Sequence, residues 1–236
     1  MSAPHSPTEL QRLYEKRFAG GGDYRDRIWR ALVNDYFVRW IPAHATVLDL
    51  GCGHCEFINN IPVEQRFGMD LNPDAVGKAA PGVCILAQSC SQPWALADNS
   101  LDIVFTSNFF EHLQTKRDLR ETLMEALRCL RTGGRIIALG PNIRYLPGAY
   151  WDFCDHHLPL TELSLGEAMA ETGFTPEKKI PRFLPYTMSR GAQPPIWMVR
   201  LYLKLKWAWP LFGKQFLVVA RKLEVEKATS CLQKEW

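Results

Sequence analysis

The stretch VLDLGCGHC, residues 47–55, joins a short apolar run to a turn that contains two glycines. Val47 to Leu50 is expected to form a buried strand, and Gly51 and Gly53 follow it directly. Glycines at this place let the backbone turn tightly and leave bare N–H groups against which a ligand can bind. The pattern is typical of an open parallel sheet, whose ligands bind beyond the carboxyl ends of the strands.

Short apolar runs alternate with helical patterns along the rest of the chain, which predicts parallel strands joined by crossover helices. Besides the first strand, we expect strands at 66–70, 83–87, 101–107, 135–139, 174–180 and 214–221. Helices are expected at about 8–18, 24–40, 57–61, 119–130 and 161–172. The Gly133-Gly134 pair is expected to end the fourth of these helices. Residues 193–210 fit both a strand and a helix period, and we favour the helix. The predicted fold class is α/β, a doubly wound and mostly parallel seven-stranded sheet with N-terminal helices.

Composition limits the class of protein. The chain has 236 residues, of which 47% are hydrophobic, and carries 28 Lys and Arg against 25 Asp and Glu. One substantial core is therefore expected, and the net charge of +3 does not call for a nucleic-acid partner. Seven cysteines and a start without basic or long apolar segments favour a reducing, cytoplasmic location. We divide the chain into a helical cap (1–43), a main domain (44–224) and a frayed tail (225–236).

Two carboxylates accompany the glycine turn. Asp49 lies within the end of the first strand, where it can accept hydrogen bonds that fix the loop or hold an ammonium group through water. Asp70 ends the second strand, where a carboxylate can accept both hydroxyls of a ribose. A dinucleotide fingerprint would require a third glycine at residue 56, but Glu56 occupies that position and would repel a pyrophosphate. A nucleoside without phosphates and with a positive sulfonium, such as S-adenosylmethionine, fits better.

The chain resembles the class I S-adenosylmethionine-dependent methyltransferases over roughly residues 46–141. VLDLGCGHC matches the first motif and FGMDLN the acidic second one. PWALADNSLDIVFTSNFFEHL matches the block around the fourth strand, and LRCLRTGGRIIALG the helix, glycine pair and fifth strand after it. The resemblance implies a Rossmann-like sheet with an antiparallel last strand and S-adenosylmethionine as cofactor. The implied cofactor-binding residues are Asp49, Gly51, Gly53, Asp70, Leu71 and Asn108, and we add Cys52, Ser89 and Cys90 as further candidates.

The chain departs from the family pattern at two places. Cys55 stands where the first motif usually has its third glycine. After the third strand, where the family often has an aspartate for the adenine amino group, the chain has Gln88, Ser89 and Cys90. Which of these contacts adenine stays open. Cys52 and Cys55 form a C-x-x-C pair, but no second pair follows at short spacing, so packing is favoured over metal or disulfide chemistry.

Candidate catalytic residues come from two segments. Glu111 and His112 follow the fourth strand, and a long loop, 140–161, carries aromatic residues together with Asp155, His156 and His157. The loop is expected to form the acceptor site. We prefer His156 or His157, oriented by Asp155, as the base, with anchoring of the loop as the alternative. In related quinone methyltransferases a carboxylate three residues before the Glu-His pair helps to hold a metal; Asn108 replaces it here, so no metal is expected.

The segment 183–212 mixes tryptophans with basic residues. It is expected to roof the sheet, with peripheral membrane contact through 196–212 as the alternative. The predicted reaction is transfer of a methyl group to an oxygen, less readily a nitrogen or carbon, of a small-molecule or glycan-like acceptor. The alternatives are a non-catalytic S-adenosylmethionine-binding protein and a nicotinamide-dependent oxidoreductase.

Overall fold

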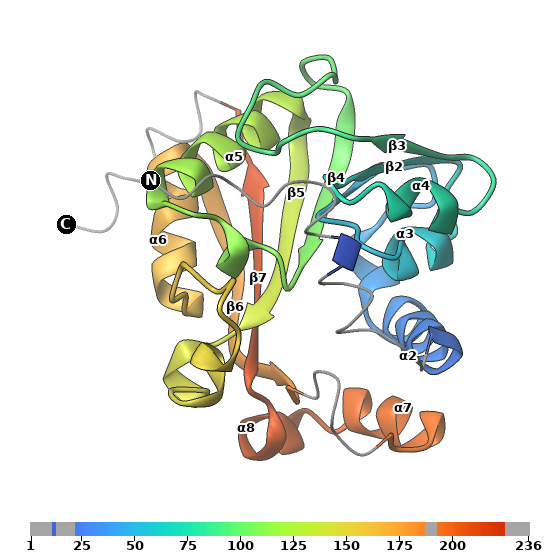
Figure 1. Cartoon of the computed structure of the whole chain (residues 1–236), viewed down its shortest axis with the longest axis vertical. Helices are drawn as coiled ribbons and strands as arrows, with labels where there is room; N and C mark the ends of the chain where they lie inside the picture. Colours follow the sequence, from blue (N-terminus) through green and yellow to red (C-terminus); the bar gives the residue numbers. More distant parts are fainter. Residues whose placement is uncertain (1–10, 13–21, 187–192, 225–236) are drawn as a thin grey trace.

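A seven-stranded sheet forms the centre of the protein in the computed structural model, which describes residues 11–12, 22–186 and 193–224 (Figure 1). The strand order is β3-β2-β1-β4-β5-β7-β6. β7 runs antiparallel to β5 and β6, and the other strand pairs are parallel. The strands are β1 (Thr46–Leu50), β2 (Gln65–Met69), β3 (Val83–Leu86), β4 (Leu101–Ser107), β5 (Leu130–Pro141), β6 (Phe174–Leu184) and β7 (Gln215–Lys222). The predicted sheet, including its antiparallel last strand, is confirmed.

The start of β5 differs from the expectation. The strand begins at Leu130, directly after the preceding helix, because Leu130 pairs with Leu101. The pairing then shifts register before Ile103. Gly133 has a φ of +85°, a conformation that side chains other than glycine rarely adopt. The glycine pair therefore lies inside the irregular start of the strand and does not end the helix.

Helices cover both faces of the sheet. They are α2 (Gly22–Asp35), α3 (Glu56–Asn60), α4 (Asp74–Lys78), α5 (Lys116–Cys129), α6 (Glu162–Thr172), α7 (Ile196–Lys204) and α8 (Trp209–Phe212). Capping boxes begin α5 at Thr115 and α6 at Thr161, and Gly173, with φ +109°, ends α6. The helical interpretation of 193–210 is confirmed. Most of the helix expected at 8–18, and the tail 225–236, lie outside the described residues.

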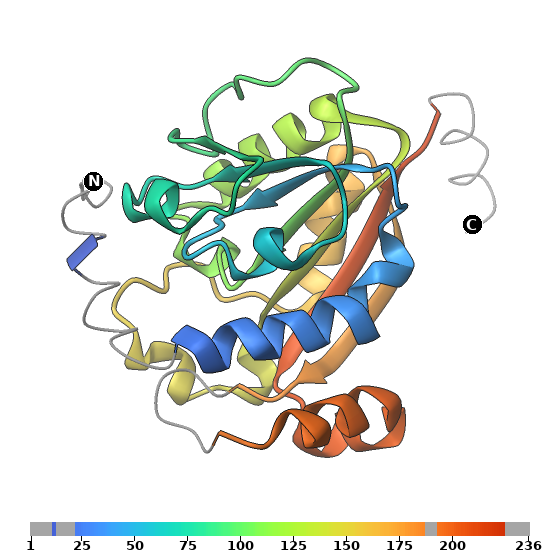
Figure 2. The ribbon, with the colours of Figure 1, turned by 90° about the vertical axis from the view of Figure 1, so that its right-hand side faces the viewer.

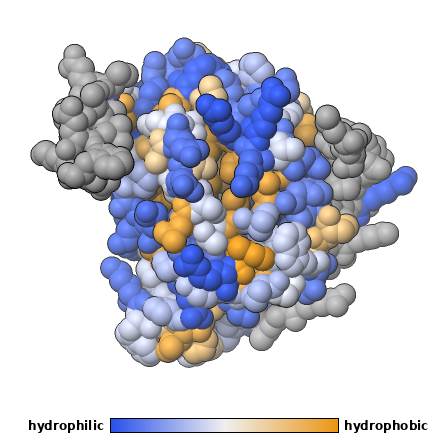
Figure 3. Space-filling view, turned by 90° about the vertical axis from the view of Figure 1, so that its left-hand side faces the viewer, coloured by the Kyte–Doolittle hydropathy of each residue, from blue (hydrophilic) through white to orange (hydrophobic). Residues whose placement is uncertain are grey.

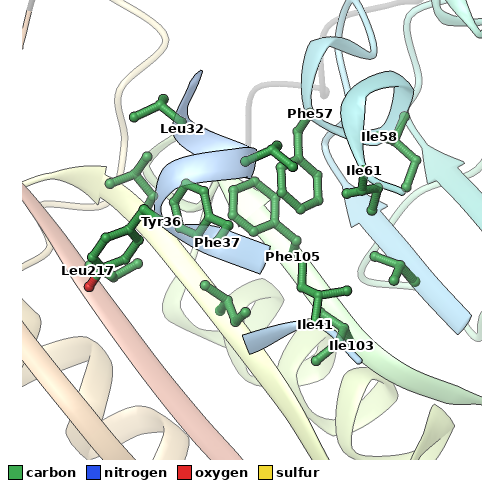
Figure 4. Close-up of a cluster of buried hydrophobic side chains, with 14 of the residues drawn as sticks. Leu32, Tyr36, Phe37, Ile41, Phe57, Ile58, Ile61, Ile103, Phe105 and Leu217 are labelled. Atoms are coloured by element: carbon green, nitrogen blue, oxygen red, sulfur yellow. The ribbon is translucent and has the colours of Figure 1, made fainter. Parts of the chain in front are cut away.

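An aromatic cluster joins α2 to the sheet (Figure 4). The ring of Phe57 on α3 stacks on that of Phe105 on β4 with 3.5 Å between centroids, and Phe37 meets Phe105 edge-on at 5.1 Å. Trp29 of α2 lies edge-on to both Phe57 and Phe105. Burial of such rings supplies much of the core energy, so α2 is packed firmly across this face, as Figure 2 shows.

The segment 193–212 lies at the edge of the sheet where the parallel strands end. α7 follows β6 in the chain and packs against α2, where Arg200 forms an ion pair with Asp35 at 3.0 Å (Figure 2). The Tyr24 hydroxyl donates to the carbonyl of Pro194 at 2.8 Å. Among the described helices, none has both the length and the apolar character needed to cross a membrane.

Candidate active site

The loop after β1 adopts the left-handed backbone that the sequence suggested. Gly51 and Gly53 have φ angles of +72° and +50°. The N–H groups of Gly51 and Cys52 both donate to the carbonyl of Met69, at 2.8 and 3.1 Å, which ties the loop to β2. A Cβ atom on Gly51 would lie 2.4 Å from the ring of Phe109. Glycine is therefore required at residue 51 both for its backbone conformation and for space.

Cys55, at the third position of the glycine motif, is also left-handed, with φ +64°. Its buried thiol donates to the carbonyl of Ala75 at 3.5 Å and lies 3.9 Å from the sulfur of Cys52. The hydrogen bond with Cys55, together with burial, raises the pKa of Cys52. A protonated, buried thiol is a poor nucleophile and metal ligand, so the pair acts as packing for the loop.

Asp70 stands at the tip of β2, as predicted, and holds the glycine loop in place. Its carboxylate accepts from the N–H of Gly53 at 2.7 Å and from that of Asn72 at 2.8 Å. Burial raises the pKa of Asp70 in spite of these hydrogen bonds. A carboxylate has about four acceptor positions, so room remains for two ribose hydroxyls. Leu71 beside it is 38% exposed, which suits an apolar contact with a flat ring.

A cleft of about 160 Å³ opens over the carboxyl ends of β1 and β4. Its lining residues are Arg25, Trp29, Asp49, Gly51, Cys52, Gly53, His54, Glu56, Phe57, Phe105, Ser107, Asn108 and His112. Burial raises the pKa of Asp49 well above its usual range, and the nearby charges of Glu56 and Asp70 raise it further. Such a site gains from a cation, because a positive ligand relieves the repulsion among the carboxylates.

Asn108 adds a second polar group to the cleft wall. It has φ +49°, and its side-chain oxygen is buried without a hydrogen-bond partner among the described residues. A buried acceptor without a partner is costly, so this oxygen is suited to a ligand that donates. Together, Asp49 and Asn108 fit the ammonium and sulfonium of S-adenosylmethionine and do not fit a pyrophosphate.

One wall of the cleft was missed by the sequence analysis. Arg25 of α2 forms an ion pair with Glu56 at 3.0 Å and contacts His54 at 3.3 Å. Trp29, one turn along α2, lines the same cleft. The helical period of residues 24–40 predicted α2, but no local pattern linked it to a loop about 30 residues away.

His112 is the cleft residue that contacts the loop 140–161. Its Nδ1 lies 3.2 Å from the Asp155 carboxylate and 3.0 Å from the Asp155 carbonyl oxygen. Burial alone would lower the pKa of His112, but the hydrogen bond to Asp155 and the charges of Glu111 and Asp155 outweigh it and raise the pKa. Because Nδ1 is held by Asp155, the other ring nitrogen, Nε2, is available to a ligand.

The two loop histidines are placed differently from the expectation. His156 is 4% exposed and packs among the rings of Tyr150, Phe153 and His112, at centroid distances of 4.8–5.0 Å. The backbone N–H of His157 donates to the carbonyl of Glu111 at 2.7 Å, which anchors the loop. Neither histidine lines the cleft. The acidic partner expected for them, Asp155, instead holds His112.

One group of side chains meets the spacing that a divalent metal would need. Ligand-type atoms of Glu111, His112 and His156 lie within 4.8 Å of one another. Two nitrogens and one carboxylate suit a transition metal better than magnesium. The expectation that no metal takes part therefore stays a prediction.

The residues expected near adenine lie outside the cleft lining. Cys90 is buried, its sulfur accepts from the Thr122 hydroxyl at 3.5 Å, and its carbonyl accepts from the Trp94 indole at 2.8 Å. Cys90 is thus part of the core, and this packing disagrees with the expectation that its side chain contacts the cofactor. The Ser89 hydroxyl lies 3.1 Å from that of Ser91, and its role stays a prediction.

Comparisons with known proteins agree with this geometry. The methyltransferase domain family matches residues 22–179. The chain belongs to this family. It is a class I S-adenosylmethionine-dependent methyltransferase, with S-adenosylmethionine as its methyl donor. The nicotinamide and non-catalytic alternatives are therefore wrong. A search of curated protein sequences finds no match.

Solved structures share the fold of this methyltransferase at low sequence identity. One is a SAM-dependent methyltransferase from Archaeoglobus fulgidus, with 22% identity, a TM-score of 0.63, and coverage of 89% of this chain and 99% of that one. Another is a SAM-dependent methyltransferase from Thermotoga maritima, with 17% identity, a TM-score of 0.66, and coverage of 92% and 100%. A further match is a chain from the complex between the Haloferax volcanii Trm112 methyltransferase activator and a putative methyltransferase. It has 16% identity and a TM-score of 0.66, and the match covers 95% of this chain and 100% of that one.

Proposed function

We propose that this methyltransferase transfers the methyl group to a hydroxyl oxygen of a small-molecule or glycan-like acceptor, with His112 as the general base. The observation that carries the proposal is the pair of His112 and Asp155, because one end of the imidazole is fixed by Asp155 while the ring lines the cofactor cleft. A hydroxyl must lose a proton to become a good nucleophile, and a histidine held in one orientation is suited to take it.

The division of labour among the residues follows from their positions. Gly51, Gly53 and Asp70 would hold the nucleoside, and Asp49 with Asn108 would hold the positive end of the donor. When bound, S-adenosylmethionine supplies a methyl group on a sulfonium carbon, ready for in-line attack. His112 Nε2 would accept the acceptor's proton while Asp155 stabilises the resulting imidazolium. The rest of the rate gain comes from alignment and exclusion of water.

The acceptor loop offers an aromatic surface next to this pair. Trp151 is 53% exposed, its ring lies 5.1 Å from that of Tyr150, and Tyr150 in turn packs against His156. An exposed indole beside a buried ring cluster is a suitable platform for the face of a sugar or an aromatic ring. This favours a ring-bearing acceptor over a short aliphatic one.

The test is an acceptor panel of phenols, catechols, free sugars and primary amines, with formation of S-adenosylhomocysteine as the readout. Carbon NMR of the product made with methyl-labelled donor distinguishes an O-methyl from an N-methyl group. We expect turnover with a hydroxyl acceptor, and loss of that turnover in His112→Gln with donor binding retained. His44→Gln is the matched control, because His44 is exposed and is distant from His112 in the sequence. Turnover with amines alone would contradict the proposal.

A further inference from the structure

Exposed apolar side chains gather on α7, on η5 (Lys206–Ala208) and on α8. Six of the twelve large apolar side chains that are exposed in the described part of the chain lie within residues 197–212. They are Trp197, Met198, Leu201, Trp207, Leu211 and Phe212, with exposed fractions of 45–68%. We call these six residues the apolar foot. Figure 3 shows apolar side chains at the lower end of the molecule, where Figure 1 places α8. Scattered exposed apolar residues are ordinary, whereas a contiguous patch marks an interaction site.

Packing against the core explains the inner side of this segment but not its outer side. Leu203 and Trp209 are buried and pack into the core that α2 shares with the sheet. The six residues of the apolar foot point away from that core, so burial in the fold cannot account for them. From the sequence, packing on the sheet and contact with a membrane are alternatives for this segment. The segment has two sides, so one side can pack on the core while the other contacts a membrane.

Hydrogen bonds hold the apolar foot in a fixed shape. Arg182 donates to the carbonyls of Gly213 at 2.7 Å and Leu211 at 2.9 Å, which fixes the end of α8. The indole N–H of Trp209 donates to the carbonyl of Tyr202 at 3.0 Å, and the Tyr202 hydroxyl donates to the carbonyl of Phe183 at 2.8 Å. A surface that is ordered before binding loses little entropy when it binds.

The stretch of sequence that carries the apolar foot has charged residues of one sign only. Residues 178–223 contain ten Lys and Arg and no Asp or Glu, whereas the rest of the chain carries 18 Lys and Arg against all 25 acidic residues. Arg200 is paired with Asp35, but Lys204, Lys206 and Lys214 are exposed and form no ion pair within the described residues. Basic residues interleaved with tryptophan, leucine and phenylalanine match the requirements of an anionic membrane surface.

We propose that the apolar foot and its lysines dock on the surface of an anionic phospholipid bilayer. The tryptophan and phenylalanine side chains would enter the headgroup region while Lys204, Lys206 and Lys214 meet lipid phosphates. α7 follows β6, which runs parallel to β1 and β4, so docking brings toward the lipid the same edge of the sheet that carries the cofactor cleft. Charge complementarity selects a lipid surface over an apolar protein partner.

Vesicle co-sedimentation of the full chain tests this proposal without any acceptor or donor. The probes are phosphatidylcholine vesicles with and without phosphatidylglycerol. We expect binding only to the anionic vesicles, and we expect added salt to weaken it. Each lysine removed should lower the membrane partition coefficient about fivefold, so Lys204→Gln/Lys206→Gln should bind more than tenfold less tightly. Trp207→Ser/Phe212→Ser is expected to abolish stable binding.

Two matched variants control for general effects of the substitutions. Met124→Ser removes an exposed apolar side chain from α5, and Lys116→Gln/Arg120→Gln removes two exposed charges from the same helix. Both are expected to bind vesicles like the wild type. Failure of the wild type to bind anionic vesicles overturns the proposal, as does equal loss in the control variants. A dimer in sedimentation that Trp207→Ser/Phe212→Ser dissociates would assign the apolar foot to a second copy and also overturn it. None of these outcomes depends on methyl transfer.

Discussion

The Asp155 carboxylate lies 3.2 Å from Nδ1 of His112, although 43 residues separate the two in the chain. η2 (Phe110–His112), after β4, supplies the histidine, and the loop after β5 supplies the aspartate. The carbonyl of Glu111 accepts two N–H groups of that loop, which fixes the distance between them. The arrangement gives His112 a defined orientation at the wall of the cleft.

His112→Gln is expected to lower kcat by about 10²–10⁴-fold, the usual contribution of general-base catalysis. Glutamine keeps a polar side chain but cannot take a proton at neutral pH. Donor affinity, measured by calorimetry, is expected to stay within a few-fold, because we propose that Asp49 and Asn108, not His112, hold the positive end of the donor. His157→Gln is the discriminating comparison, since His157 does not line the cleft. Equal losses of kcat in both variants would contradict the assignment of His112 as the base and would favour the loop histidines instead.

The pH profile gives a second measure of the same pair. The pKa of His112 is raised above 6.5, and a general base must be neutral, so kcat/KM is expected to fall as the pH drops through a midpoint above 6.5. Asp155→Asn removes a charge that raises this pKa. The midpoint should therefore move to lower pH, even as the plateau rate falls because the imidazolium loses its partner. An unchanged midpoint in Asp155→Asn would show that the fall of kcat/KM at low pH reports the titration of another group.

Asp49→Asn is expected to raise the stability of the ligand-free protein and to lower its affinity for the donor. The folded pKa of Asp49 is raised, so its ionised form costs free energy at neutral pH, and the folded state loses stability as the pH rises above the ordinary carboxyl range. Asparagine removes that cost, so thermal unfolding of the ligand-free protein at pH 7 should occur at a higher temperature. Donor affinity should fall by about 10–100-fold, the value of a hydrogen bond to a charged group.

Glu167→Gln, at an exposed acidic residue of α6, is the control for Asp49→Asn and should change neither property. A lower melting temperature for Asp49→Asn would mean that the carboxylate has a structural partner which asparagine fails to replace. Unchanged donor affinity would remove Asp49 from the binding site.

Residues with a strong local pattern were predictable, and residues whose role depends on distant contacts were not. The positions of Gly51, Gly53 and Asp70 could be predicted because parallel strands bring their carboxyl ends to one edge of the sheet. The early start of β5 was missed because it arises from the pairing of Leu130 with Leu101, which no helical or strand period reveals. For the same reason, the sequence identified Asp155 as an acid that orients a histidine but paired it with the neighbouring His156 or His157 instead of His112.

Gly51→Ala is expected to destabilise the fold by about 1–3 kcal/mol from backbone strain alone, because φ is +72°, with a further loss from the clash with Phe109. Gly51→Ala/Phe109→Ala should recover the steric part but not the strain, so the two substitutions should be non-additive in urea unfolding. Gly77→Ala is the control: that glycine lies in α4, and no atom lies within 4 Å of the place that an added methyl carbon would take, so the change should be neutral or slightly stabilising.

Removal of metal ions is expected to leave methyl transfer intact, even though ligand-type atoms of Glu111, His112 and His156 lie within 4.8 Å of one another. Asn108 is neutral, and a metal would compete with the proton that His112 has to accept, since metal binding requires a neutral imidazole. The kcat after exhaustive dialysis against a chelator should therefore equal that of the untreated enzyme. Glu111→Gln sharpens the distinction. The charge of Glu111 raises the pKa of His112, so without a metal the variant should only shift the midpoint of the pH profile to lower pH. Activity that is lost on chelation, restored by added manganese or zinc, and abolished in Glu111→Gln at every pH would instead assign the three side chains to a bound ion.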